Sequence, residues 1–150
     1  MSEVVVRRAR DDDRDLLFAW RNDPVSVATS GSRTPVDAGT HATWFAAMLA
    51  DPDVMLLIGE VDGRPIGMVR FDIDRRSSHA VVSINLDPHA RGRGLAQPFL
   101  LTAVDAARAD RPGPIDAVVR RDNTASLRLF AGAGFRRSGT DDEFVNFTLD

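Results

Sequence analysis

The chain has 150 residues, of which 43% are hydrophobic and 27% charged, and its net charge is −3. This composition is typical of a folded globular protein, and the slightly acidic balance gives no general attraction to nucleic acid or to an anionic membrane. Cysteine is absent, which excludes disulfides, thiolate metal sites and a cysteine nucleophile. Lysine and tyrosine are absent too, so every basic side chain other than histidine is an arginine.

The N-terminal stretch, MSEVVVRRARDDD, lacks the apolar core of a signal peptide, and no apolar run is long enough to span a bilayer. The length suits one domain, and the sequence shows no repeat and no linker that would divide it. We therefore expect residues 1–150 to form a single cytoplasmic domain.

The first part of the chain predicts a strand, a helix and a loop. Val4–Val6 is a short β-branched run typical of a strand. Asp11–Asp13 can cap a helix whose apolar face ends with Trp20, and Asn22-Asp23-Pro24 ends that helix. Val25–Val36, rich in Ser, Thr and Gly, is interpreted as an irregular loop.

The middle of the chain predicts a second helix and then three antiparallel strands. The helix begins at Asp37 and ends at Asp51-Pro52-Asp53. A hairpin turn at Asp62-Gly63 and a turn at Arg75–Ser78 join the strands. The strands are Val54–Val61, Ile66–Phe71 and Ala80–Leu86.

In the last third, helices and strands alternate. The predicted helices are Leu95–Arg111 and Thr124–Ala133, the predicted strands are Ile115–Val119 and Phe144–Leu149, and a further short strand is expected near Phe135–Ser138. The predicted order is thus β-α-α-β-β-β-α-β-α-β.

The most informative segment, Leu86–Ala96, joins a predicted strand to a predicted helix. Gly92, Gly94 and Ala96 stand at alternate positions and let the backbone come close to a ligand. The amides at the start of the next helix have no partner within the helix, and two arginines in the segment add positive charge. These features predict an anion-binding site suited to a pyrophosphate.

Two other phosphate-binding loops do not fit this segment. The dinucleotide fingerprint would need glycine where Gln97 stands, and the ATP-binding P-loop would need a lysine, which the chain lacks. A glycine-rich turn with a purely structural role is the remaining alternative.

The core of the segment, Arg91-Gly92-Arg93-Gly94-Leu95-Ala96, resembles the coenzyme A loop of the GNAT superfamily of N-acetyltransferases, whose pattern is Arg/Gln-x-x-Gly-x-Gly/Ala. Asn123–Phe135 resembles the family's helix Asn-x-x-Ser/Ala-x-x-Leu-Tyr-x-x-x-Gly-Phe. Together these motifs cover about the C-terminal half. The resemblance implies the GNAT fold, an α/β (α+β) architecture with a mixed, mostly antiparallel splayed sheet of about six to seven strands and about four helices.

The resemblance also implies acetyl-CoA as co-substrate, with no metal. It places acetyl-CoA in the V between the strands that end near Leu86 and Val119, with its pantetheine paired to the backbone of Ile84–Leu86. Its pyrophosphate would meet the amides of Gly92–Ala96. The cofactor-binding residues that the resemblance implies are Ile84, Leu86, Arg91, Gly92, Arg93, Gly94, Leu95, Ala96, Asn123 and Phe130.

Two positions depart from the family pattern. Pro98 falls early in the helix after the loop, where it removes an amide, and we expect it to shift or kink the first turns. Phe130 stands where many members have the tyrosine that protonates the departing thiolate. Because a thiol has a pKa of roughly 8.5, it needs an acid less than an alkoxide does, and water can serve as the proton donor.

The candidate catalytic residues are His41, Ser83 and Asn85. Ser83 and Asn85 lie on the more polar face of a predicted strand and could hold a water molecule. His41 is a candidate base because an imidazole titrates near neutral pH. The other two histidines, His79 and His89, are interpreted as surface residues.

The N-terminal half is similar to a narrower group, the acetyltransferases of pseudaminic acid biosynthesis that act on amino-sugar nucleotides. The similar segments are Trp20–Pro24, His41-x-x-Trp44-Phe45 and Ile66–Asp72. This resemblance implies a substrate pocket formed by Arg21, Asn22, His41, Trp44 and Arg70. The structural alternative is that Trp20 and Trp44 belong to the core and that Arg21 and Asn22 simply end a helix.

Two other functions fit the same motifs. One is a protein N-terminal acetyltransferase of the ribosomal-protein type, and the other is a non-catalytic acyl-CoA-binding module, which the missing tyrosine favours. The expected partner is a small-molecule amine, with a sugar nucleotide as the specific expectation and no nucleic acid or membrane. A homodimer is the expected assembly if the chain is not a monomer.

Overall fold

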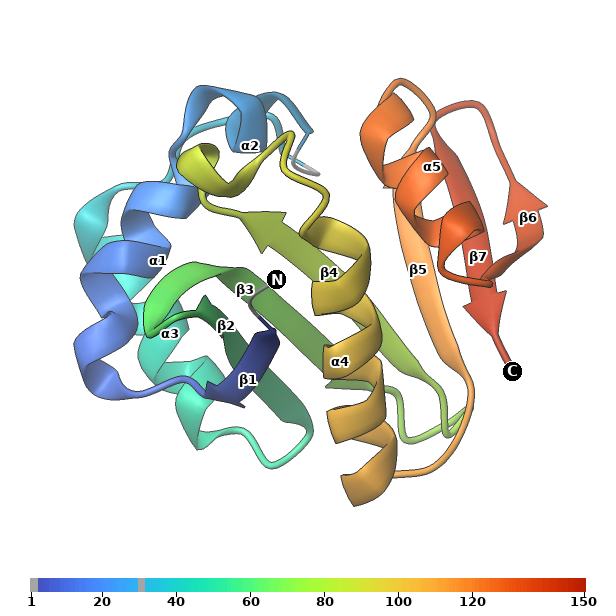
Figure 1. The fold of residues 1–150 in the computed structure, drawn as a ribbon, viewed down its shortest axis with the longest axis horizontal. Coiled ribbons are helices and arrows are strands. Elements are labelled where there is room, and N and C mark those ends of the chain that lie inside the picture. Colours follow the sequence, from blue (N-terminus) through green and yellow to red (C-terminus); the bar gives the residue numbers. More distant parts are fainter. Residues whose placement is uncertain (1–2, 30–31) are drawn as a thin grey trace.

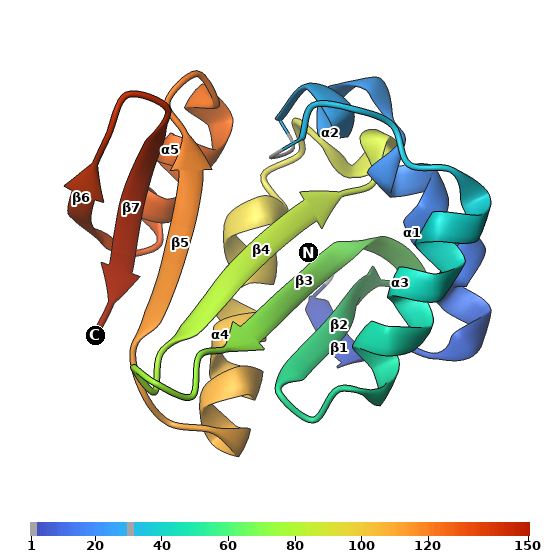
Figure 2. The same ribbon diagram turned by 180° about the vertical axis from the view of Figure 1, so that it is seen from behind.

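A sheet of seven strands crosses the molecule, with α4 and α5 on one face and α1 and α3 on the other (Figures 1 and 2). The computed structural model describes residues 3–29 and 32–150. The strands follow the order β1-β2-β3-β4-β5-β7-β6, and among the described pairs only β4 and β5 are parallel. The predicted mixed, mostly antiparallel fold is confirmed.

The seven strands are β1 (Val4–Arg8), β2 (Val54–Val61), β3 (Arg64–Ile73), β4 (Ala80–Leu86), β5 (Ile115–Arg120), β6 (Arg136–Thr140) and β7 (Phe144–Leu149). The α-helices are α1 (Arg14–Arg21), α2 (Pro24–Thr29), α3 (Ala38–Ala50), α4 (Ala96–Asp110) and α5 (Thr124–Gly132), and short 3-10 turns are η1 (Asp11–Asp13) and η2 (Pro88–Ala90).

The helix α2 was not predicted, because Asp23-Pro24 was interpreted as a helix end when it is also a helix start. The carboxylate of Asp23 accepts a hydrogen bond from the amide of Ser26 at 3.1 Å, as an N-cap does, and Pro24 takes the first helical position. The predicted loop Val25–Val36 is therefore wrong over Val25–Thr29. Residues 30 and 31 of that predicted loop lie outside the described residues.

The nearly continuous apolar run of β2 follows from its position between two layers of helices. Leu56 and Ile58 pack with residues of α1 and α3, whereas Met55 and Leu57 belong to the cluster that packs against α4. Since successive side chains of a strand point to opposite faces, both sets of β2 must be apolar.

Two glycines bring α4 close to the sheet. Gly59 and Gly67 pair across β2 and β3, and the fully buried ring of Phe99 lies beside both of them. A Cβ atom at Gly59 would overlap that ring, and one at Gly67 would also overlap the carbonyl oxygen of Asn85. The close approach fixes the beginning of α4 over β2 and β3.

Pro98 does not kink α4, contrary to the expectation from sequence. It lies in the first turn of the helix, where an amide has no partner within the helix in any case. The first helical bond, from the amide of Phe99 to the carbonyl of Leu95, forms at 3.0 Å.

No helix within residues 3–29 and 32–150 combines the length and the apolar character needed to cross a bilayer.

Candidate active site

The strands β4 and β5 separate after two paired residues, and this opening is the centre of the site. They pair only at Ala80 with Ile115 and at Val81 with Asp116, although β4 pairs with β3 over its whole length. Figure 2 shows the two strands diverging from that closed end. Beyond Val81 the β5-facing edge of β4 has no strand partner among the described residues, so an extended ligand can pair with it as an added strand would.

A cavity of about 540 Å³ lies at the open end of the V. Its lining comes from α1, α2, α3 and α5 and from β3, β4 and β5, so both halves of the sheet contribute. The residues that line it are Leu17, Trp20, Arg21, Ser26, Thr29, Val36, Thr40, His41, Trp44, Met68, Arg70, Val82, Ser83, Ile84, Asn85, Val118, Val119, Arg120, Asn123, Ser126 and Phe130.

The glycine-rich loop between β4 and α4 has the geometry of an anion-binding loop. Gly92 and Gly94 have φ angles of +71° and +72°, which favour glycine, and a Cβ atom at either would meet no atom within 4 Å. No side chain caps the start of α4, so the amides of Ala96 and Gln97 point out of the helix without a cap. Space for a close ligand and unpartnered donors therefore occur together, and the loop fits a pyrophosphate.

The two arginines of this loop differ in what they contact. Arg91 donates from Nη1 to the Asp23 carboxylate at 2.7 Å and from Nη2 to Ser26 Oγ at 3.1 Å and the Leu86 carbonyl at 3.0 Å. Arg93 is exposed, and its side chain makes no hydrogen bond or ion pair with the described residues. The structure thus leaves Arg93, rather than Arg91, available to an anion at the loop.

The remaining residues expected at the cofactor have different positions. Ile84, Asn123 and Phe130 line the cavity, whereas Leu86 and Leu95 are half-buried and do not. Asn123 caps α5, because its Oδ1 accepts the amide of Ser126 at 3.2 Å. Phe130 is 3% exposed and packs against other phenylalanine rings of the core.

On the side of the cavity formed by α1 and α3, His41 is a buried titratable residue. It is 2% exposed, neither ring nitrogen has a hydrogen-bond partner among the described residues, and the rings of Phe18, Trp44 and Phe45 surround it. Burial, reinforced by the positive charges of Arg21 and Arg14, lowers the pKa of His41 below its ordinary value. The imidazole is therefore neutral at physiological pH and able to accept a proton.

Two arginines, Arg21 and Arg70, line the same cavity as His41. Arg21 donates from Nη2 to Ser32 Oγ at 3.2 Å, while its Nη1 is buried without a hydrogen-bond partner in the described part of the chain. The Arg70 guanidinium lies 5.7 Å from the ring centre of Trp44 and donates from Nε to Asp72 at 2.8 Å. Both guanidinium groups therefore keep donor capacity toward the cavity.

Two amides expected in the site are engaged in structural contacts. Asn22 does not line the cavity, because its side chain pairs with the backbone of Val36 through bonds of 2.6 and 2.8 Å. Asn85 lines the cavity, but its Oδ1 accepts from Ser26 Oγ at 2.9 Å and its Nδ2 donates to the Trp20 carbonyl at 3.3 Å. Ser83 has no such contact with the described residues and is the better placed of the strand pair to hold a water.

Sequence reasoning missed several lining residues, among them Ser26, Ser126 and Arg120. Ser26 was missed because the helix α2, which positions it, was not predicted. The signal for that helix was Asp23-Pro24, an N-cap residue followed by proline. Ser126 stood within the motif that predicted Asn123, one turn before Phe130, so the same helical spacing could have identified it.

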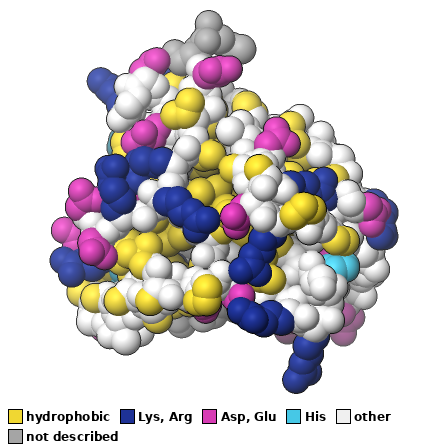
Figure 3. Space-filling model, turned by 90° about the horizontal axis from the view of Figure 1, so that it is seen from below, with side chains coloured by type: hydrophobic (Ala, Val, Ile, Leu, Met, Phe, Trp, Pro, Cys, Tyr) yellow, Lys and Arg dark blue, Asp and Glu magenta, His cyan; other side chains and the backbone are white. Residues whose placement is uncertain are grey.

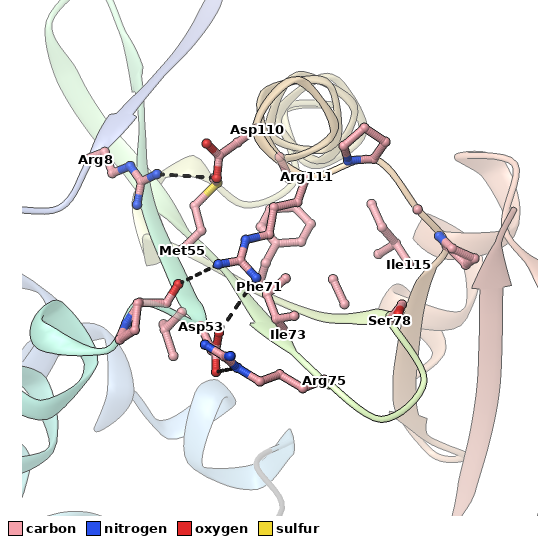
Figure 4. Close-up of a pocket in the computed structure, with 17 residues that line it drawn as sticks. Arg8, Asp53, Met55, Phe71, Ile73, Arg75, Ser78, Asp110, Arg111 and Ile115 are labelled. Carbon is pink, nitrogen blue, oxygen red and sulfur yellow. Dashed lines mark hydrogen bonds and ion pairs between the residues drawn. The ribbon is translucent and has the colours of Figure 1, made fainter.

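A second cavity, of about 680 Å³, opens at the closed end of the sheet, below the C-terminal end of α4. Figure 3 shows this face, where apolar side chains lie between arginines and carboxylates. Three ion pairs surround the cavity in Figure 4: Arg75 with Asp53 at 2.6 Å, Arg111 with Asp53 at 3.7 Å, and Arg8 with Asp110 at 4.0 Å. All three arginines that line it among the described residues thus pair with carboxylates.

The comparison with protein families agrees with this site. The family model described as "Acetyltransferase (GNAT) domain" matches residues 3–136. The chain therefore belongs to the GNAT acetyltransferase domain family. In the described residues, no group of three or more His, Cys, Asp or Glu side chains could hold a metal ion.

Named relatives are acetyltransferases. The chain is 28% identical over 113 residues to a mycothiol acetyltransferase of Clavibacter sepedonicus, a match that covers 75% of this chain and 35% of the relative. It is 31% identical over 142 residues to a phosphinothricin N-acetyltransferase of Alcaligenes faecalis, covering 89% of this chain and 71% of the relative. The chain thus spans about a third of the length of the mycothiol enzyme that it matches.

Among solved structures, the fold matches the aminoglycoside acetyltransferase AAC(6')-Ib in complex with ribostamycin and coenzyme A, with a TM-score of 0.86 and 19% identity. This match covers 97% of the present chain and 92% of the other. At this identity the likeness shows the fold alone.

Proposed function

We propose that this protein transfers the acetyl group of acetyl-CoA to the primary amine of a small acceptor that carries a negative charge, specifically an amino-sugar nucleotide. The observation that carries the acceptor class is the charge of the cavity. Among the described residues its lining contains Arg21, Arg70 and Arg120 and no carboxylate, in a chain whose net charge is −3. An arginine-lined cavity attracts phosphate or carboxylate and repels a polycation.

The cofactor half of the proposal rests on the loop and on the edge of β4. The open sides of Gly92 and Gly94 and the uncapped amides of α4 would hold the pyrophosphate, with Arg93 as a further cation. The unpaired edge of β4 beyond Val81 would hold the pantetheine arm. The Nδ2 of Asn123 makes no hydrogen bond with the described residues, and Asn123 lines the cavity that this arm would enter.

The proposed chemistry needs a neutral amine, an in-line thioester and a group that takes the amine proton. His41 is neutral because burial lowers its pKa, and it would accept the proton directly or through a water held by Ser83. The amine nitrogen bonds to the acetyl carbon, the carbon–sulfur bond breaks, and the thiolate takes a proton from water. Phe130 offers no proton, but a thiol leaving group does not require a strong acid.

A second candidate acceptor is an amino acid analogue. The specific observation is the relative named phosphinothricin N-acetyltransferase, to which 89% of the chain aligns. A carboxylate on such an acceptor would meet the same arginines. The two candidates differ in the number of charges to be bound, and so in how strongly each depends on Arg21 and Arg70.

An acceptor panel tests the proposal. Release of free coenzyme A is followed with a thiol reagent, for which the cysteine-free chain gives no background. The panel contains a uridine-diphosphate amino sugar, the free amino sugar, an amino acid analogue, spermidine, ribostamycin and a peptide with a free N-terminus. We expect turnover of the nucleotide-linked sugar to be fastest. Turnover confined to the polycations or to the peptide contradicts the proposed acceptor class, and no turnover with any amine supports a binding module.

The variant Arg21→Ala sharpens the test. A hydrogen bond to a charged group contributes about 1.5–3 kcal/mol, so the KM for the anionic acceptor should rise by about tenfold to about a hundredfold. The KM for acetyl-CoA should stay nearly unchanged. Arg14→Ala is the matched control for the KM, because Arg14 lies on the same helix, pairs with Asp15 and does not line the cavity. Its charge also lowers the pKa of His41, so kcat is not compared.

A further inference from the structure

We propose that Arg91 is a positioning residue that couples the cofactor loop to α2, so that coenzyme A bound at the loop orders the acceptor side of the cavity. This inference rests on the proposed cofactor site. Arg91 belongs to the loop between β4 and α4, and its three hydrogen bonds reach Asp23 and Ser26 of the α2 region and the end of β4. Arg91 therefore joins the proposed cofactor loop to α2, which lines the side of the cavity where the acceptor would bind.

A closed set of hydrogen bonds continues from this arginine. Ser26 Oγ lies 2.9 Å from Asn85 Oδ1, and Asn85 Nδ2 donates to the carbonyl of Trp20 at 3.3 Å. The indole of Trp20 donates to Asp87 at 2.7 Å, and Asp87 lies at the beginning of the loop that contains Arg91. The ends of α1 and α2 are thus tied to the cofactor loop from both sides.

The helix α2 depends on these polar contacts for its position. It has six residues, which is too short to be stable by itself, and Ser26 is its only buried residue. Val25, on the same helix, is 56% exposed. A segment with few buried apolar contacts opens at low free energy, so a change at Arg91 would alter its order.

The contacts of Arg91 also argue against a role as a direct phosphate ligand. Burial alone would raise the pKa of Asp23, but the guanidinium of Arg91 and the amide of Ser26 hold that pKa below its ordinary value. Asp23 is therefore charged at neutral pH, and a pyrophosphate would have to compete with its carboxylate for Arg91. Arg93, two residues on, has no such competitor among the described residues.

Hydrogen exchange of α2, measured by mass spectrometry with and without coenzyme A, tests the proposal without knowledge of the acceptor. In the unmodified protein, coenzyme A should slow exchange of the α2 amides by about fivefold or more, the lower range of coupling between sites. In Arg91→Ala this protection should disappear, while the Kd for coenzyme A from calorimetry rises by no more than about fivefold, the reciprocal effect of the lost coupling. Asp23→Asn should behave in the same way, because asparagine keeps an oxygen for the helix cap and loses the charge that pairs with Arg91.

Arg93→Ala is the matched control, since it removes the same charge from the same loop. It should weaken coenzyme A binding and, at saturating coenzyme A, keep the protection of α2. Loss of more than about tenfold in affinity in Arg91→Ala with little loss in Arg93→Ala would make Arg91 a direct ligand and overturn the proposal. Protection of α2 that survives in both Arg91→Ala and Asp23→Asn would overturn it too. If the unmodified protein does not bind coenzyme A, the proposed function itself fails.

Discussion

The buried imidazole of His41 leads to a prediction in which stability and activity change in opposite directions. Both ring nitrogens lack partners in the described structure, and an unsatisfied buried polar group costs about 1–3 kcal/mol. Leucine is similar in size and carries no polar atom. His41→Leu should therefore raise the free energy of unfolding by about 1–3 kcal/mol near neutral pH, which corresponds to about 2–12 °C in Tm for a domain of this size.

The gain in the free energy of unfolding from His41→Leu should increase as the pH falls. Burial and two nearby arginines lower the pKa of His41 from its ordinary 6.5, so the unfolded chain takes up a proton at pH values where the folded chain does not. The stability associated with the neutral imidazole is complete above the unfolded pKa and is lost progressively below it. Leucine does not titrate, so the difference between variant and unmodified protein should be larger at about pH 5 than at about pH 7.5.

Circular dichroism melts at the two pH values measure the stability, and thiol release with the best acceptor of the panel measures the activity. If His41 is the base, kcat should fall by about 10²–10⁴. Thr43→Leu is the control, because Thr43 is exposed on the same helix and the substitution replaces its hydrogen bond to the Gly39 carbonyl with a higher helix propensity, neither of which titrates. A variant that is less stable at both pH values, or one that keeps full kcat, refutes the reasoning.

Three further predictions concern the loop, the helix α5 and an ion pair. Gly94→Val should lower coenzyme A affinity by at least about tenfold in calorimetry. A β-branched residue at a φ of +72° costs about 1–3 kcal/mol, and its side chain would fill the open side of the loop. Unchanged affinity would show that the cofactor binds elsewhere. Phe130→Tyr should change kcat by less than about tenfold, whereas a gain of about 10³ would show that a missing acid limits the enzyme. Two hydrogen bonds from Arg7, each 2.8 Å, hold the pKa of Asp13 below its ordinary value despite burial. The charged carboxylate therefore adds to the free energy of unfolding, and this contribution is lost as the pH falls below about 4. Asp13→Asn should therefore cost about 1–3 kcal/mol in urea denaturation near neutral pH and progressively less in acid, and a difference independent of pH would contradict this account.

Local signals in the sequence were sufficient for most of the fold. The hairpin at Asp62-Gly63 and the alternating run Ala80–Leu86 predicted three successive antiparallel strands, and the structure confirms them. The short strand expected near Phe135–Ser138 exists as β6. These elements follow from turn chemistry and side-chain alternation, which depend only on neighbouring residues.

The roles of side chains within the candidate site were harder to predict, because they depend on partners far away in the chain. Arg91 looked like a cofactor ligand from its motif, yet its partner Asp23 lies 68 residues earlier. Asn85 looked free to hold a water, but its amide contacts the ends of α1 and α2. Motifs indicate which atoms are near a ligand, but only the folded chain shows which donors are already engaged.

Because only two residue pairs join β4 to β5, a small change of angle at these pairs becomes a larger displacement at the open end of the V. Leu86 stands six residues from Ala80, or about 20 Å at about 3.3 Å per residue, so a rotation of about 3° at that pairing moves the strand end by about 1 Å. A displacement of about 1 Å between reacting groups can cost about a hundredfold in rate. Ala80 and Ile115 also line the cavity at the closed end, together with Phe71. A substitution that changes the packing of this distant cavity should therefore change the angle between β4 and β5, and with it the distance between the groups at the proposed site.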